Sequence, residues 1–274
     1  MSGLTRPWEA RFGRSFRTLC IICGWLLAGG RVGAGTTNAS PAGMKIDLAD
    51  PPIVTGTFYE IGSNRKTVLF KYRRVATRDE DVIQVEQTFT IPDGSVACRE
   101  NIRYQNGELV SYAMQDLRAG SRGSVVVEPD PKKPKKERLQ LVYAEDGGKI
   151  QKASETAQPN TLISDTIYPY ILGHWDELLA GGAVKFRFIS LDPPATFSFR
   201  LTKDSEGTWQ GRPFVGIKME PTNFIVAHWI RPIFFTIEQA APHRVFSYTG
   251  RTTPRILTGG AWKFADAEAV FDWP

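Results

Sequence analysis

The sequence predicts a mainly β fold: a large curled antiparallel sheet, or an incompletely closed β-barrel, with a short helical insert. Two observations predict the strands. From residue 56 onward, apolar and polar side chains mostly alternate, as they do in strands that bury one face. Tight-turn signals such as Asn106-Gly107 separate the alternating segments, and two-residue turns join only antiparallel neighbours. The insert is predicted at residues 161–180, where apolar residues recur at spacings near three and four.

The first 35 residues have the order of a secretory signal peptide. A basic run with Arg6, Arg11, Arg14 and Arg17 precedes an apolar segment at residues 19–28 and small residues at 32–35, which is the order of n-region, h-region and cleavage site. The apolar segment is far shorter than the roughly 20 residues of a spanning helix. We therefore expect the leader to be removed and the mature protein to be periplasmic or secreted, with no transmembrane span.

Removal of the leader changes the charge and cysteine arguments. It takes away five of the 34 basic residues and one of the 29 acidic residues, so the net charge falls from +5 to about +1. A nearly neutral chain gives no reason to expect nucleic-acid binding. Cys20 and Cys23 also lie in the leader, so Cys98 remains alone and an intramolecular disulfide is excluded in the mature chain.

Residues 36–55 are predicted to be a flexible linker, because small and polar residues and three prolines dominate them. Residues 56–274 then form a single β-rich domain. Its first half is predicted as strands at residues 66–75, 82–91, 95–104, 108–114 and 138–143. The lysine-rich run at residues 129–136 is interpreted as a solvated connector between strands, because like charges repel and stay in solvent. A patch for lipid headgroups or an acidic partner is the alternative.

The insert at residues 161–180 is predicted as one or two amphipathic helices, interrupted at Pro169 or Gly173. Strands resume at residues 184–191, 196–201, 214–219, 233–238, 244–248 and 268–272. Residues 223–235 contain consecutive large apolar side chains. They fit a segment buried on both faces, the lining of an apolar cavity closed by the insert, or core packing with no ligand. The candidate lining residues for such a groove are Tyr168, Tyr170, Ile171, Trp175, Trp229 and Phe234.

The order of these segments resembles an uncharacterised family of bacterial periplasmic proteins. The resemblance rests on the leader, the first meander, the helical segment with Tyr168, Tyr170 and Trp175, and the glycine-containing start of the second meander at residues 179–186. Residues 242–251 are similar to the strand and glycine near that family's end. Members of the family resemble, in turn, the carriers that ferry lipoproteins to the outer membrane. The resemblance implies an open β-barrel with a helical lid over an apolar concave face, and it transfers no catalytic residue.

The mature chain contains no established catalytic or cofactor motif, so we expect no cofactor. Its histidines, His174, His228 and His243, lack the spacing of metal ligands, and no metal is expected. In the cluster of His174, Asp176 and Glu177, the side chains of His174 and Glu177 lie one helical turn apart and could share a metal or a proton. A helix end with a solvated polar face is the simpler interpretation. Cys98 could act as a nucleophile if a histidine packed beside it. In its strand it is more simply a small buried apolar residue.

Two hypotheses for the function follow. The favoured one is a non-enzymatic binding or scaffolding protein of the cell envelope, with an apolar groove for a lipid or for a hydrophobic segment of an envelope protein. The alternative is a periplasmic hydrolase that uses Cys98 or the group of His174, Asp176 and Glu177. A histidine within hydrogen-bond reach of Cys98 would favour the enzyme, whereas an open apolar trough would favour the binding protein.

Overall fold

The computed structural model describes residues 47–228 and 230–273. The predicted signal peptide, residues 36–46 of the predicted linker and Trp229 lie outside the described residues. No helix in the described part of the chain is long and apolar enough to cross a membrane.

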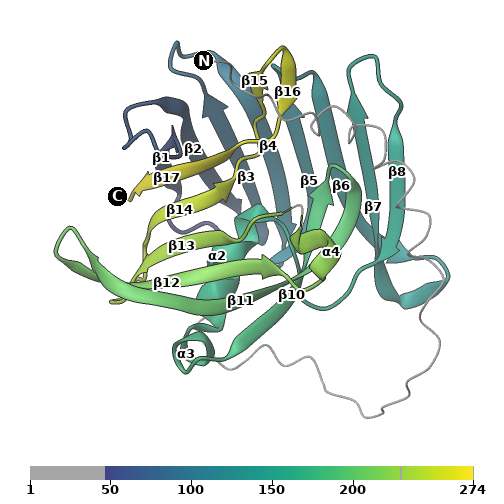
Figure 1. The fold of residues 1–274 in the computed structure, drawn as a ribbon. Coiled ribbons are helices and arrows are strands. Elements are labelled where there is room, and N and C mark those ends of the chain that lie inside the picture. Colours follow the sequence, from purple (N-terminus) through teal and green to yellow (C-terminus); the bar gives the residue numbers. More distant parts are fainter. Residues whose placement is uncertain (1–46, 229, 274) are drawn as a thin grey trace. The chain divides into compact units, whose positions relative to one another are not determined.

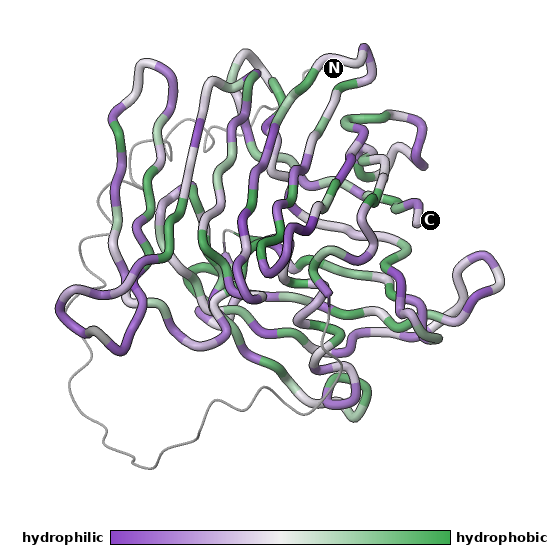
Figure 2. The backbone as a smooth tube through the Cα atoms, turned by 180° about the vertical axis from the view of Figure 1, so that it is seen from behind, coloured by the Kyte–Doolittle hydropathy of each residue, from purple (hydrophilic) through white to green (hydrophobic). Residues whose placement is uncertain are grey.

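The first eight strands form an antiparallel meander, in which each strand pairs with the next along the chain (Figure 1). They are β1 (Ile53–Glu60), β2 (Val68–Asp79), β3 (Val82–Thr90), β4 (Val96–Gln105), β5 (Glu108–Asp116), β6 (Ser121–Asp130), β7 (Lys133–Glu145) and β8 (Gln151–Thr156). Side chains with odd and even numbers point to opposite faces of such strands. The inward face is therefore lined by every second residue, as the alternation of buried and exposed residues in β3 and β4 indicates. Figure 2 shows hydrophilic and hydrophobic positions interspersed along the strands.

The second half of the chain contains the helices and a second meander. Its elements are β9 (Thr161–Leu162), α2 (Ser164–Gly173), α3 (Trp175–Leu179), β10 (Ala183–Leu191), β11 (Pro194–Trp209), β12 (Arg212–Pro221), α4 (Phe224–Ala227), β13 (Ile233–Glu238), β14 (Val245–Arg251), β15 (Ile256–Thr258), β16 (Ala261–Lys263) and β17 (Asp266–Asp272). Strands β10 to β14 pair in sequence order, and β15 and β16 form a separate hairpin.

The strand β17 joins the two meanders, because it pairs with β1 on one side and with β14 on the other. The result is a 15-stranded sheet that runs from β8 at one edge to β9 at the other. The two edge strands do not pair with each other among the described residues, so the sheet is curled but not closed.

The curl brings the two ends of the sheet against each other. Glu155 of β8 accepts hydrogen bonds from the backbone N–H (3.2 Å) and the hydroxyl (2.6 Å) of Thr196 on β11. Gly123 of β6 faces Leu191 of β10 so closely that a Cβ at residue 123 would lie 2.8 Å from the Leu191 Cβ. Side chains rather than backbone pairing therefore hold the overlap.

Helix α2 occupies the inside of the curl, between strands β2–β5 and strands β10–β13, and α3 follows it at the lower end of the molecule in the view of Figure 1. One face of the two helices is apolar, because Ile167, Ile171, Trp175 and Leu178 follow one another at intervals of three or four. This face packs on the buried side chains of β10–β14. Burial of each of these side chains contributes roughly 1.5–3 kcal/mol.

The mainly β class and the helical insert are confirmed, and each of the eleven predicted strands overlaps a strand of the structure. The helix α2 continues through Pro169 and ends at Gly173, the second of the two predicted interruptions. Strand β1 begins at Ile53, within the predicted linker.

Two local predictions need correction. Strand β7 begins at Lys133, inside the lysine-rich run for which the charge pattern predicts a connector. The lysines stay exposed at the hairpin tip while the backbone remains paired. Residues 223–235 are not buried on both faces at their start. Asn223 caps the short helix α4 by accepting a hydrogen bond from the Ile225 N–H (2.8 Å), and Phe224 is 82% exposed.

Candidate functional site

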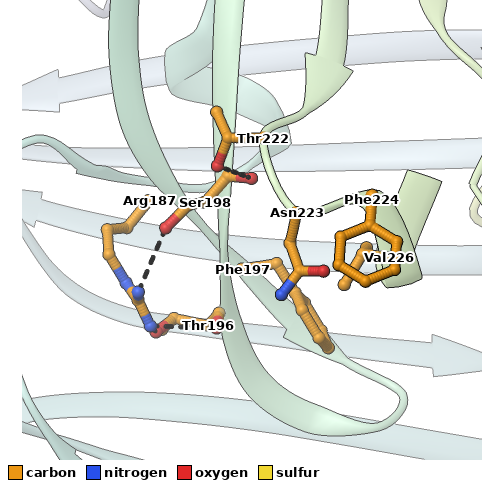
Figure 3. A pocket seen from close by; sticks show the side chains of 8 residues that line it. All are labelled: Arg187, Thr196, Phe197, Ser198, Thr222, Asn223, Phe224 and Val226. Atoms are coloured by element: carbon orange, nitrogen blue, oxygen red, sulfur yellow. Dashed lines mark hydrogen bonds between the residues drawn. The ribbon is translucent and has the colours of Figure 1, made fainter. Parts of the chain in front are cut away.

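Two adjoining hollows lie on the surface where β10, β11 and the end of β12 meet. The first has a volume of about 550 Å³ and is lined by Arg187, Thr196, Phe197, Ser198, Thr222, Asn223, Phe224 and Val226 (Figure 3). The second has a volume of about 460 Å³ and is lined by Gln158, Pro159, Lys185, Phe186, Arg187, Ser198, Phe199 and Thr222. Because Arg187, Ser198 and Thr222 line both, the two hollows form one continuous depression, called here the β10–β12 groove.

Arg187 is the cation at the centre of the β10–β12 groove. Its guanidinium donates hydrogen bonds to the hydroxyl and the carbonyl of Thr196 and to the hydroxyl of Ser198 (3.2 Å). The Glu155 carboxylate lies 3.7 Å away. These contacts fix the orientation of a side chain that remains 35% exposed, so its charge is held in place and still faces solvent.

The apolar wall of the groove comes from α4 and β11. Phe197 of β11 and Phe224 and Val226 of α4 line the first hollow, and Figure 3 shows the Phe224 ring beside Val226, across the hollow from Arg187. The side-chain oxygen of Asn223 (Oδ1) caps α4, so the side-chain NH2 group remains as a donor toward the groove. The depression thus combines a fixed cation, polar donors and exposed aromatic surface.

A second polar cluster is buried inside the curl, at the start of α2. The Asp165 carboxylate accepts hydrogen bonds from Arg74 (2.7 Å), Gln87 (2.7 Å) and Tyr104 (2.9 Å) of strands β2, β3 and β4. Burial opposes the charge of Arg74, but the neighbouring Asp165 outweighs it and raises the pKa of Arg74. Burial, reinforced by Asp165, raises the pKa of Tyr104. A carboxylate in the first turn of a helix also interacts favourably with the helix dipole. Through its hydrogen bonds to β2, β3 and β4, this cluster anchors α2 to the first meander.

Glu100 of β4 is buried next to this cluster. The strand register places it opposite Gln87, which in turn lies opposite Arg74, so a polar row crosses the inner face. Neither carboxylate oxygen of Glu100 has a hydrogen-bond partner among the described residues. Burial raises its pKa to about 7; the hydroxyls of Thr253 and Tyr112 oppose that shift without reaching hydrogen-bond geometry, and Asp165 adds to it. In the folded protein the Glu100 carboxyl is therefore protonated and uncharged below about pH 7.

Comparisons with known proteins assign no family to the chain. No protein-family model matches it, and no curated protein matches it. Among solved structures it is similar to a beta-barrel-like protein of domain of unknown function DUF1849 from Brucella abortus. The identity is 8%, the match covers 80% of this chain and 95% of that chain, and the TM-score is 0.36. This similarity is too low to assign a family or a site, and the resemblance to periplasmic lipoprotein carriers stays an expectation.

The predicted groove residues are placed in several environments. Ile171 and Trp175 belong to the apolar core between the helices and β10–β14. Tyr168 donates a hydrogen bond to the His243 carbonyl (3.0 Å), and Tyr170 donates one to the Lys185 carbonyl (3.1 Å). Phe234 is 38% exposed on β13, and Trp229 lies outside the described residues. None of the five described candidates lines the β10–β12 groove.

The residues of the alternative hydrolase are not assembled into a catalytic group. Cys98 is fully buried, and burial, followed by the charges of Glu100 and Asp116, raises the pKa of its thiol. A thiol held protonated is a poor nucleophile. His174 contacts the Tyr170 carbonyl (2.9 Å) through Nδ1, while Asp176 and Glu177 are exposed.

The described residues contain no group of three or more metal-ligating side chains. Sequence reasoning missed both Arg187 and Glu100. The signal for Glu100 was present, since it shares the inward phase of β4 with Cys98, Ile102 and Tyr104. Arg187 had no comparable signal, because Glu155 reaches it only through the curl and the other residues around it come from separate segments of the chain.

Proposed function

We propose that this protein is a non-enzymatic binding protein for an anionic amphiphile such as a fatty acid or a lipid. The ligand's acidic group lies against Arg187 in the β10–β12 groove, and its chain lies along Phe197, Phe224 and Val226. The observation that carries the proposal is the pairing of a fixed cation with a Phe224 ring that is 82% exposed at the edge of the same hollow.

The energetics favour such a ligand. Large exposed aromatic surface beside a hollow is typical of binding sites, and covering a phenylalanine contributes roughly 1.5–3 kcal/mol. The guanidinium geometry suits a carboxylate or phosphate, because its donors form a fork that fits two oxygens. The volume of about 550 Å³ lies within the range of small-molecule sites.

The hydrolase alternative has less support. The raised thiol pKa and full burial of Cys98 oppose nucleophilic attack, and His174, Asp176 and Glu177 lie at a helix end as the simpler interpretation expects. A binding role requires none of these groups.

We also propose that the protein acts in the periplasm or outside the cell, on the basis of the leader at residues 1–35. Mass spectrometry of the protein from its native host should find a chain that begins near residue 36. A chain intact from Met1 in the membrane fraction would overturn this part of the proposal.

The binding proposal is tested with a dansyl-labelled fatty acid, whose fluorescence rises when its environment becomes apolar. Phe224→Ser should weaken binding about ten- to a hundred-fold, by loss of the covered ring. Leu257→Ser is the matched control, because Leu257 is 56% exposed on β15 and lies outside the groove. Equal affinities for Phe224→Ser and the wild type, or no binding by the wild type, would refute the proposal.

A further inference from the structure

The outward face of strands β2, β4 and β6 in the first meander carries five exposed cations. They are Lys71, Arg73, Arg99, Arg103 and Arg122, on strands β2, β4 and β6. Each one alternates with inward neighbours such as Phe70, Cys98 or Gly123, so all five point away from the core. These five residues are called here the basic face.

The strand register arranges three of these arginines in one row. Arg73 lies opposite Thr88 and Thr88 opposite Arg99. Arg99 lies opposite Gln115 and Gln115 opposite Arg122. Neighbouring strands are about 4.8 Å apart, so cations recur about every 10 Å, with a hydroxyl or an amide between them.

The basic face differs from the outer face of the second meander in how its charges are matched. On β11 and β12, Arg200, Arg212 and Lys218 each form an ion pair with a glutamate. Within the described residues, none of the five cations of the basic face forms an ion pair. Glu86 points to the same face and is hydrogen-bonded to Thr88 (3.4 Å). One half of the sheet thus neutralises its own charge, and the other half keeps an excess of positive charge.

We propose that the basic face is a docking surface for a flexible acidic polysaccharide. Repeated carboxylate, phosphate or sulfate groups would pair with the arginine row, while sugar hydroxyls would bond Thr88 and Gln115 between the arginines. The polymer runs across the strands, and its binding is independent of the ligand in the β10–β12 groove.

The geometry favours a flexible saccharide chain over two other polyanions. Neighbouring strands of a twisted sheet rotate by about 20–25°, so arginines two strands apart diverge and a flat bilayer reaches only part of the row. The side chains between the cations are Thr88, Gln115 and Asn101, with no aromatic ring on which the bases of single-stranded nucleic acid could stack.

The test measures binding of the full chain to a heparin oligosaccharide. The triple variant Arg73→Gln, Arg99→Gln, Arg122→Gln should bind on the order of a hundred-fold more weakly, since each cation near an anionic surface contributes about 1 kcal/mol. The control triple variant Arg200→Gln, Arg212→Gln, Lys218→Gln removes the same three charges from the other half of the sheet and should keep most of the affinity. An unchanged thermal midpoint shows that both variants fold.

Three results would overturn the proposal. The first is an equal loss in both triple variants, which would mean that net charge alone drives binding. The second is absence of saccharide binding by the wild type. The third is tighter binding, dependent on Arg99, to phosphatidylglycerol vesicles or to single-stranded DNA than to the saccharide. The dansyl-labelled fatty acid should bind the first triple variant as it binds the wild type, so failure here leaves the groove proposal untouched.

Discussion

Replacement of Glu100 by glutamine should abolish a specific loss of stability between pH 4.5 and pH 7. The Glu100 carboxyl has an ordinary pKa of 4.5, and burial raises it to about 7 in the folded protein. Between these two values the unfolded chain has lost the proton while the folded protein keeps it. Stability therefore falls as the pH rises through this window, and the loss is complete above the folded pKa.

The size of the effect follows from the shift. The difference between 4.5 and about 7 corresponds to about 3 kcal/mol at roughly 1.4 kcal/mol for each pH unit. Glutamine is close in size to neutral glutamic acid and does not ionise. Near pH 4.5 the free energy of unfolding of the variant should equal that of the wild type. By pH 8 it should exceed that of the wild type by about 3 kcal/mol, apart from any constant difference between burying an amide and burying a neutral acid.

The assay is urea unfolding followed by tryptophan fluorescence, for both proteins at several pH values from 4.5 to 8. The difference between the two free energies of unfolding is the relevant quantity, because the other titrating groups are common to both proteins and cancel. Glu108→Gln, at an exposed residue of β5, is the control and should leave the pH dependence as it is. Parallel curves for the wild type and Glu100→Gln would refute the reasoning and would mean that Glu100 contacts solvent.

Three further changes test the inside of the curl. Asp165→Ala should lower the free energy of unfolding by about 3–5 kcal/mol in urea titrations, because Arg74 would be left buried without its partner; a change below 1 kcal/mol would contradict the anchoring role of the cluster. Cys98→Ala should cost about 1 kcal/mol and leave binding intact, and the native thiol should resist labelling at neutral pH, so rapid labelling would revive the nucleophile. Trp175→Ala should cost about 3–5 kcal/mol, as measured by thermal and urea unfolding; a stably folded variant that binds a hydrophobic dye would instead support an apolar groove beneath the helices.

Much of the fold could be predicted from the sequence, because its signals are local. The alternation in residues 66–114 and the Asn106-Gly107 turn predicted β2 to β5 nearly to their ends. The change to helical spacing located α2 and α3. These patterns act over a few residues, so the sequence alone is sufficient to detect them.

The candidate site could not be predicted in the same way. The β10–β12 groove combines Gln158, Arg187 and Phe224, which come from three separate segments, and only the pairing of β9 with β10 and of β11 with the end of β12 brings them together. A run of large apolar residues at 223–235 suggested burial, but the cap at Asn223 turns the chain into a short helix that exposes Phe224. Local capping chemistry outweighed the apolar composition there.

The position of β17 between β1 and β14 has a consequence for assembly. Each meander can form from neighbouring hairpins while the chain is being synthesised. The seam between the two meanders is the pairing of β1 with β17, and it can form only after residues 266–272, some 200 positions later in the chain, have been made. Such long-range closure is intrinsically slow, so during folding the two half-sheets exist for a time with the edges of β1 and β14 unpaired. Joining the sequence across that seam and opening it between β8 and β9 would give a chain in which only two antiparallel pairs are not simple hairpins. They are β12 with β13, which α4 separates, and β14 with β17, which β15 and β16 separate. That rearranged chain should refold faster than the natural one while reaching the same curl.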